Sequence, residues 1–122
     1  DDEAFNMLST LAHEWASGST RFDRPGEALV AAYDGTTLVG MGAMTLDPGV
    51  SGALRMRRFY VARPYRRRGV GRLLAKALLE RPEVGARMVT LNAPHAEAAR
   101  FWEALGFIRN AEGDRTHVRA VA

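Results

Sequence analysis

The stretch that decides the fold is Arg66-Arg67-Arg68-Gly69-Val70-Gly71, which lies between two apolar segments. A β-prone run, Phe59-Tyr60-Val61, precedes it, and an apolar run with helical spacing, residues 73–79, follows it. A strand therefore leads into a glycine loop, and the loop opens a helix. The first N–H groups of a helix lack intrahelical acceptors and lie at the positive end of its dipole. Because glycine lets a bulky anion approach this backbone, the stretch predicts a phosphate-binding site.

Length and composition are typical of one globular domain, which we expect to span residues 1–122. Of these residues, 47% are hydrophobic and 25% are charged. No run approaches the roughly 20 apolar residues that a membrane span needs, and the acidic start is unlike a signal peptide. The absence of cysteine excludes disulfides and thiolate metal sites. We therefore expect a cytoplasmic protein with no membrane partner and no metal site.

Positive charge is concentrated around the glycine loop. Residues 55–72 contain eight arginines and no acid, whereas the rest of the chain is net acidic. A nucleic-acid binder usually spreads positive charge over a face or along a helix. Aromatic residues that could stack on bases interleave with the arginines only at Phe59, Tyr60 and Tyr65. Nucleic-acid binding is therefore the last-ranked alternative, and we expect no nucleic-acid partner.

Hydrophobic periodicity and turn residues predict the order of the elements. Asp34-Gly35 predicts a tight hairpin, and Gly40 and Gly42 predict close backbone approach or a bulge. The pattern predicts one α+β domain with a mixed sheet. The expected helices are 2–16, 69–81 and 96–105, and the expected strands are 28–33, 37–46, 55–61, 87–92, 107–108 and 116–121.

Three kinds of phosphate loop can be compared with this one. A Walker-type loop needs Lys-Ser/Thr after its last glycine, but Gly71 is followed by Arg72-Leu73. A dinucleotide-binding loop needs a third glycine where this chain has Leu74. The third kind is Arg/Gln-x-x-Gly-x-Gly after a strand and a proline, with an aromatic helix downstream. The chain has this arrangement in Arg66-x-x-Gly69-x-Gly71, followed by Phe101-Trp102-Glu103-Ala104-Leu105-Gly106-Phe107.

On these residues the chain resembles the GNAT superfamily of N-acetyltransferases, which use acetyl-CoA, and in particular its bacterial single-domain members. The resemblance runs from about Glu27 to Thr116 and includes the hairpin, the strand 58–61 with Pro64, the loop and the aromatic segment. It implies a mixed, mostly antiparallel sheet flanked by helices, with two parallel strands that splay apart to bind CoA. The family's usual first strand has no counterpart here. Either the residues that form it precede Asp1, or a neighbouring subunit covers that edge in a homodimer.

The resemblance implies acetyl-CoA as the cofactor and indicates which residues bind it. The backbone of residues 67–72 would hold the pyrophosphate, and the pantetheine arm would add to the strand ending at Tyr60-Val61 like an extra strand. A backbone N–H near Val61 would polarise the thioester carbonyl. The predicted cofactor-binding residues are Phe59, Tyr60, Val61, Arg66, Arg67, Arg68, Gly69, Val70, Gly71, Arg72, Asn92, His95, Ala98, Phe101 and Trp102.

Two positions depart from the family pattern. Trp102 stands where many relatives have a tyrosine that acts as general acid, and an indole N–H cannot deliver a proton. Arg55 stands where many relatives have a glutamate base, and arginine is always charged. A thiol of pKa about 8.5 leaves without much help, but the incoming ammonium must still lose a proton.

The catalytic candidates for that proton transfer are Glu27, Tyr60 and His95. Each also has an ordinary structural interpretation: Glu27 as a solvated strand end, Tyr60 as a core residue, and His95 as a surface residue at a helix start. His13, on the first expected helix, lies either near the acceptor or on the surface with no functional role. The arginines at 55, 57 and 58 either attract an acidic acceptor or form a solvated strand face.

The resemblance implies transfer of an acetyl group to a primary amine of a small molecule or peptide. Direct attack in a ternary complex is expected, because no cysteine is available to form an acyl-enzyme. The alternative is a non-catalytic acyl-CoA-binding sensor, which the altered tyrosine and glutamate positions motivate.

Overall fold

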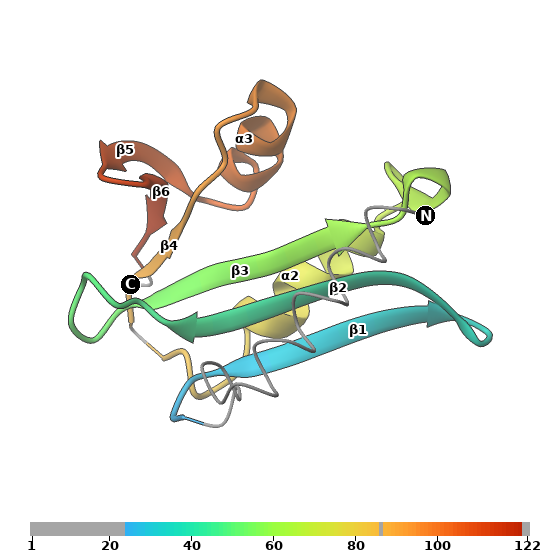
Figure 1. Ribbon diagram of the computed structural model, residues 1–122, viewed down its shortest axis with the longest axis horizontal. Helices are drawn as coiled ribbons and strands as arrows, with labels where there is room; N and C mark the ends of the chain where they lie inside the picture. Colours follow the sequence, from blue (N-terminus) through green and yellow to red (C-terminus); the bar gives the residue numbers. More distant parts are fainter. Residues whose placement is uncertain (1–23, 86, 121–122) are drawn as a thin grey trace.

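The computed structural model describes residues 24–85 and 87–120 (Figure 1). Its α+β architecture, a mixed sheet with helices, is the one predicted. Within these residues no helix is both long and apolar enough to cross a membrane. The expected helix 2–16 and His13 lie outside the described part of the chain. The elements are β1 Ala28–Asp34, β2 Thr37–Leu46, β3 Leu54–Val61, the 3-10 turn η1 Arg63–Tyr65, α2 Val70–Leu79, β4 Val89–Leu91, α3 Ala96–Glu103, β5 Ile108–Glu112 and β6 Arg115–Arg119.

The six strands form one sheet in the order β1-β2-β3-β4-β6-β5. Every neighbouring pair is antiparallel except β3 and β4, which are parallel. The predicted hairpin is confirmed, because β1 and β2 are joined through Gly35, whose φ is 62°. Helix α2 lies against one face of β1, β2 and β3 (Figure 1). There Leu78 packs in the main core with Met44 and Met56.

The parallel strands β3 and β4 separate after a short contact, as predicted. They pair only at Leu54–Val89 and Arg55–Thr90. Strand β3 then continues to Val61, whereas β4 ends at Leu91. The expected strand 87–92 was therefore too long, because the chain leaves the sheet after Leu91 to enter α3.

Aromatic side chains fill the wedge between the diverging strands. The ring of Phe59 on β3 lies 4.8 Å from that of Trp102 and 5.8 Å from that of Phe101, measured between centroids. Phe107 packs edge-on against Trp102, at 5.4 Å between centroids. Since α3 carries two of these rings, its packing on β3 holds the open end of the strand pair apart.

A bulge in β3 accompanies the close approach predicted at Gly42. Met41 pairs with Tyr60 and Ala43 pairs with Arg57, so β3 has one extra residue in this interval. Within it Arg58 has a φ of 53°. A Cβ on Gly42 would lie 2.8 Å from the Phe59 ring, so only glycine lets the aromatic residue sit this close to β2.

A buried ion network closes the other end of the β3–β4 pair. The Asp47 carboxylate, after β2, accepts hydrogen bonds from Thr90 Oγ1 at 2.6 Å, from the Gly49 amide at 2.8 Å and from two nitrogens of Arg115. The bonds from the Arg115 guanidinium hold the pKa of Asp47 well below its usual range. Asp47 therefore ties the end of β2 to β4 and β6 where β3 and β4 are still paired.

Candidate functional site

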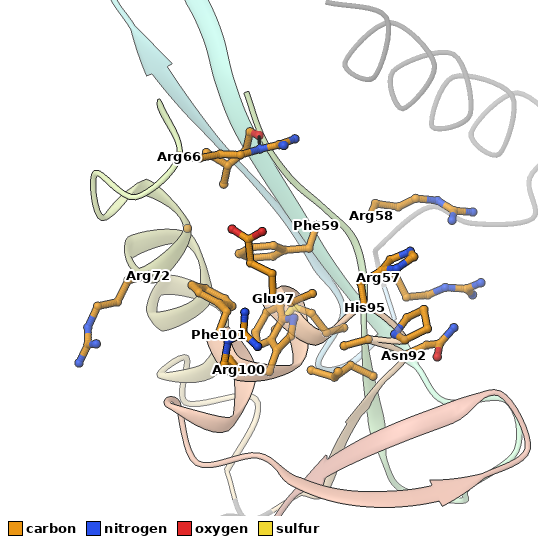
Figure 2. Close-up of a pocket in the computed structure, with 18 of the residues that line it drawn as sticks. Arg57, Arg58, Phe59, Arg66, Arg72, Asn92, His95, Glu97, Arg100 and Phe101 are labelled. Atoms are coloured by element: carbon orange, nitrogen blue, oxygen red, sulfur yellow. Dashed lines mark hydrogen bonds between the residues drawn. The ribbon is translucent and has the colours of Figure 1, made fainter. Parts of the chain in front are cut away.

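A cleft of about 1060 Å³ opens where β3 and β4 diverge. Its walls come from β3, the loop before α2, the turn after β4 and the first turns of α3 (Figure 2). Apolar rings form part of its floor and charged side chains surround it. The lining residues are Met56, Arg57, Arg58, Phe59, Val61, Arg66, Arg67, Gly69, Gly71, Arg72, Leu91, Asn92, Ala93, Pro94, His95, Glu97, Ala98, Arg100, Phe101 and Trp102.

The loop before α2 lines this cleft and leads into the first turn of the helix. Arg67 and Gly69 have left-handed φ values of 63° and 86°, and Gly69 is the N-cap of α2. The first helical bond runs from the Leu73 amide to the Gly69 carbonyl at 3.0 Å. The amides of residues 69–72 therefore have no acceptor within the helix. Successive backbone N–H groups of this kind form an anion-binding nest, which suits a phosphate group.

The side chains around the loop make the cleft strongly basic. Six arginines and one acid, Glu97, line it. Arg67 forms an ion pair with Glu97 at 3.3 Å across the gap between the loop and α3. Arg66 instead donates from Nε to the carbonyl of Val61 at 2.8 Å, which fixes the loop to the end of β3. The positive field favours a ligand that carries several negative charges.

The edge of β3 that faces the cleft offers further backbone groups. The Ala62 amide donates to the Val39 carbonyl at 2.8 Å, so it points toward β2. Since successive N–H groups along a strand point to opposite edges, the Val61 amide points to the cleft edge. Beyond Arg55 this edge pairs with no strand among residues 24–85 and 87–120. An extended chain of amides could bind there by strand addition.

A chain of hydrogen bonds behind the cleft fixes the turn after β4. The Ala93 amide donates to Thr116 Oγ1 at 2.8 Å, and Thr116 Oγ1 lies 2.8 Å from His117 Nδ1. His117 is fully buried, and its Nε2 lies 2.8 Å from Glu103 Oε2. A neutral imidazole protonated on Nε2 satisfies every link: the Thr116 hydroxyl donates to Nδ1, and Nε2–H donates to the carboxylate. Sequence reasoning missed these hydrogen bonds, because Ala93, Glu103 and the Thr116-His117 pair are separated from one another in the sequence.

Most of the predicted cofactor-binding residues lie together in the cleft. Three predicted residues do not line it. Tyr60 is buried at 6% exposure next to the lining residues. Arg68 stacks its guanidinium 5.7 Å from the Tyr65 ring centroid. Val70 faces β2: its Cγ1 lies 3.3 Å from the position that a Cβ on Gly40 would occupy.

The three catalytic candidates lie in different environments. His95 is the exposed N-cap residue of α3 and lines the cleft. Tyr60 is buried, with the Arg66 guanidinium 6.0 Å from its ring centroid. Glu27 is also buried, and its carboxylate accepts a bond from the Leu46 amide at 2.9 Å. Since Leu46 pairs with Leu54, Glu27 lies at the closed end of the strand pair, outside the cleft lining.

The two positions that depart from the expected pattern have structural partners. Trp102 is buried within the aromatic wedge. Arg55 donates two hydrogen bonds to the Asp114 carboxylate, at 3.1 and 3.2 Å. This guanidinium lowers the pKa of Asp114.

Comparison with known proteins gives a match to one family. The model described as the acetyltransferase (GNAT) family matches residues 2–107. A protein from Exiguobacterium sp. 255-15, assigned as an acetyltransferase, superposes with a TM-score of 0.80 at 23% identity over 98% of this chain and 78% of its own. A GNAT acetyltransferase from Staphylococcus aureus Mu50 gives 0.72 at 17% identity over 89% and 77%. At these identities the likeness shows a shared fold.

A further solved structure contains a ligand. The PaiA N-acetyltransferase of Thermoplasma acidophilum, in complex with coenzyme A, has a TM-score of 0.61 at 14% identity, over 78% of this chain and 61% of its own. No curated protein sequence gave a significant match.

Proposed function

The chain belongs to the GNAT family of acetyltransferases, and we propose that it transfers the acetyl group of acetyl-CoA to a primary amine of a small molecule or peptide. The observation that carries the proposal is the cleft itself. It joins a helix N-terminus with left-handed residues at 67 and 69 to an edge of β3 that, past Arg55, pairs with no other described strand. These two features suit the two parts of coenzyme A, a pyrophosphate and an amide-rich arm. The bound coenzyme A in the Thermoplasma relative supports the assignment.

The residues of the cleft fit this donor. The amides of residues 69–72 would bind the pyrophosphate, and Arg72 would add charge beside them. The pantetheine arm would pair with the β3 edge between Met56 and Val61. When bound, acetyl-CoA supplies an activated acyl group and a thiol leaving group of pKa about 8.5.

The chain's own groups would then position and activate the reaction. The Val61 amide, which points to the cleft edge, would donate to the acyl carbonyl oxygen, where negative charge grows during attack. His95 is the catalytic candidate that lines the cleft, so we assign it the role of taking a proton from the acceptor's ammonium group, which leaves a neutral amine that can attack. The sequence contains no cysteine, so the amine attacks the thioester directly. Glu27 and Tyr60 lie outside the lining and have no assigned step.

Acetyl-CoA binding is tested by calorimetry and by the shift in thermal unfolding. The decisive variant is Gly71→Glu, because a Cβ at this position lies 3.4 Å from the Phe101 ring and the longer side chain must enter the cleft. Its carboxylate would displace and repel the phosphates. The matched control is Leu73→Glu, which adds the same charge to the same helix at a side chain that is 71% exposed. We expect binding by the wild type and by Leu73→Glu and loss of binding in Gly71→Glu. No wild-type binding at millimolar acetyl-CoA would reject the proposal.

Turnover is tested by following thiol release with a panel of primary amines. Release with at least one amine, together with mass-spectrometric detection of the acetylated product, is the expected result. Tight acetyl-CoA binding without release on any amine would instead support the sensor alternative.

A further inference from the structure

The face of β3 opposite α2 carries two arginines with different surroundings. Met56 packs in the core with Leu78 of α2. Because side chains alternate along a strand, Arg55 and Arg57 on either side of it point to the opposite face. Arg55 is buried at 9% exposure and is held by two hydrogen bonds from its guanidinium to Asp114. A carboxylate therefore neutralises the first of the two arginines.

Arg57 has no such partner among residues 24–85 and 87–120. No hydrogen bond or ion pair joins its guanidinium to these residues, although the residue is half-buried. Its neighbour across the β2–β3 ladder is Ala43, which supplies no polar side chain. Placing a guanidinium in a partly desolvated position without an anion is unfavourable, and an anionic ligand would remove that cost.

The position of Arg57 in the cleft separates it from the predicted phosphate site. In Figure 2 its side chain points away from Arg66 and Arg72, on the side of the cleft where Asn92 and His95 are drawn. The loop before α2 offers its backbone nest at the other end of the same cleft. Arg57 is therefore placed near the proposed proton acceptor, His95, and not beside the groups proposed to bind the donor's phosphates.

We propose that Arg57 binds a carboxylate of the acceptor, so that the substrate class is primary amines that carry a carboxylate. This inference rests on the proposed acetyl transfer. The planar guanidinium of Arg57 can donate two parallel bonds to a carboxylate, as its neighbour Arg55 does to Asp114. The acceptor's amine would then be directed to the thioester beside His95.

The test compares amines that differ only in the anion. Rates of acetylation are measured for 4-aminobutyrate, for butylamine and for 3-aminopropylphosphonate, with Arg57→Gln, Arg57→Lys and Arg109→Gln as variants. Arg109 is an exposed arginine on β5 outside the cleft, so it controls for the loss of one charge. We expect the wild type and Arg109→Gln to favour 4-aminobutyrate over butylamine by about 10- to 100-fold in kcat/KM. This ratio falls toward one in Arg57→Gln and is partly kept in Arg57→Lys.

Three outcomes would overturn the inference. They are equal use of butylamine by the wild type, an equal loss for both amines in Arg57→Gln, and a preference for the phosphonate over the carboxylate. A protein that binds acetyl-CoA but acetylates no amine would contradict the proposed function instead. In that case calorimetry with 4-aminobutyrate in the presence of CoA decides: binding that weakens in Arg57→Gln and not in Arg109→Gln supports the carboxylate site, and absence of binding overturns it.

Discussion

The substitution Asp47→Asn tests whether the buried ion network holds the closed end of the strand pair. The Asp47 side chain is completely buried, and its two oxygens accept bonds from Arg115, from Thr90 at 2.6 Å and from the Gly49 amide at 2.8 Å. Asparagine keeps the shape but removes the charge and replaces one acceptor oxygen with an NH₂ donor. Arg115 then faces a group that cannot accept both of its bonds.

The expected cost follows from burial. Removing one member of a buried charge pair costs about 3–5 kcal/mol. The Arg115 side chain is 15% exposed and keeps Asp114 at 3.8 Å, so we expect the lower end, about 3 kcal/mol. For a domain of this size, the unfolding temperature should fall by about 10–15 °C. The control is Asp34→Asn, where an exposed carboxylate accepts one bond from Tyr65 and the expected change is below about 1 kcal/mol.

Acid titration of the same variant checks the cause. Hydrogen bonds from Arg115 lower the pKa of Asp47 below its ordinary value of 3.8. A carboxyl group whose pKa is lowered in the folded state stabilises the fold at pH values above its unfolded-state pKa. This contribution is lost as the pH falls through the folded-state pKa. The gap between wild type and Asp47→Asn in thermal unfolding should therefore be constant above about pH 5 and shrink below pH 4. Equal unfolding temperatures at pH 7, or a gap that persists in acid, would refute the reasoning.

Three further substitutions examine the cleft and the packing behind it. Thr116→Val leaves the Ala93 amide without its acceptor, and we expect a loss of about 1–3 kcal/mol in unfolding free energy; unchanged thermal unfolding would contradict this. Gly42→Ala forces the Phe59 ring to move, since the new Cβ would lie 2.8 Å from it, and should cost about 1–3 kcal/mol by denaturant unfolding, whereas a neutral effect would count against the tight packing. His95→Gln should lower kcat about 10²- to 10⁴-fold while calorimetry shows unchanged acetyl-CoA affinity, and an unaltered kcat would remove His95 from the mechanism.

The local signals in the sequence were sufficient for the order of the described elements and for the strand–loop–helix segment, but not for every boundary: the expected strand 107–108 runs over Ile108–Glu112 in the fold. Asp34-Gly35 predicted the hairpin, and glycines 40 and 42 predicted close approach because only a missing Cβ permits it. The loop could be placed because its glycines and arginines are contiguous, and most of the predicted cofactor-binding residues line one cleft. That these residues bind acetyl-CoA is a prediction that the binding measurements above test.

Long-range contacts could not be derived in the same way. Glu27 was a candidate for the proton transfer, yet in the fold its carboxylate accepts a hydrogen bond from the amide of Leu46 on the neighbouring strand. The partners Glu103 and His117 meet only because β6 returns beside β4 and α3. Likewise, Arg55 is neutralised and Arg57 has no ionic partner within the described part of the chain, and this contrast depends on where the β5–β6 turn places Asp114. None of these pairings leaves a periodic pattern in the chain.

The most direct measurement is a crystal structure of the protein with coenzyme A. The account predicts that the pyrophosphate accepts hydrogen bonds from the amides of residues 69–72. It also predicts that the pantetheine arm runs along the edge of β3 toward Val61 while β3 and β4 stay apart. A ligand bound elsewhere, or a cleft in which these two strands pair along their whole length, would contradict it.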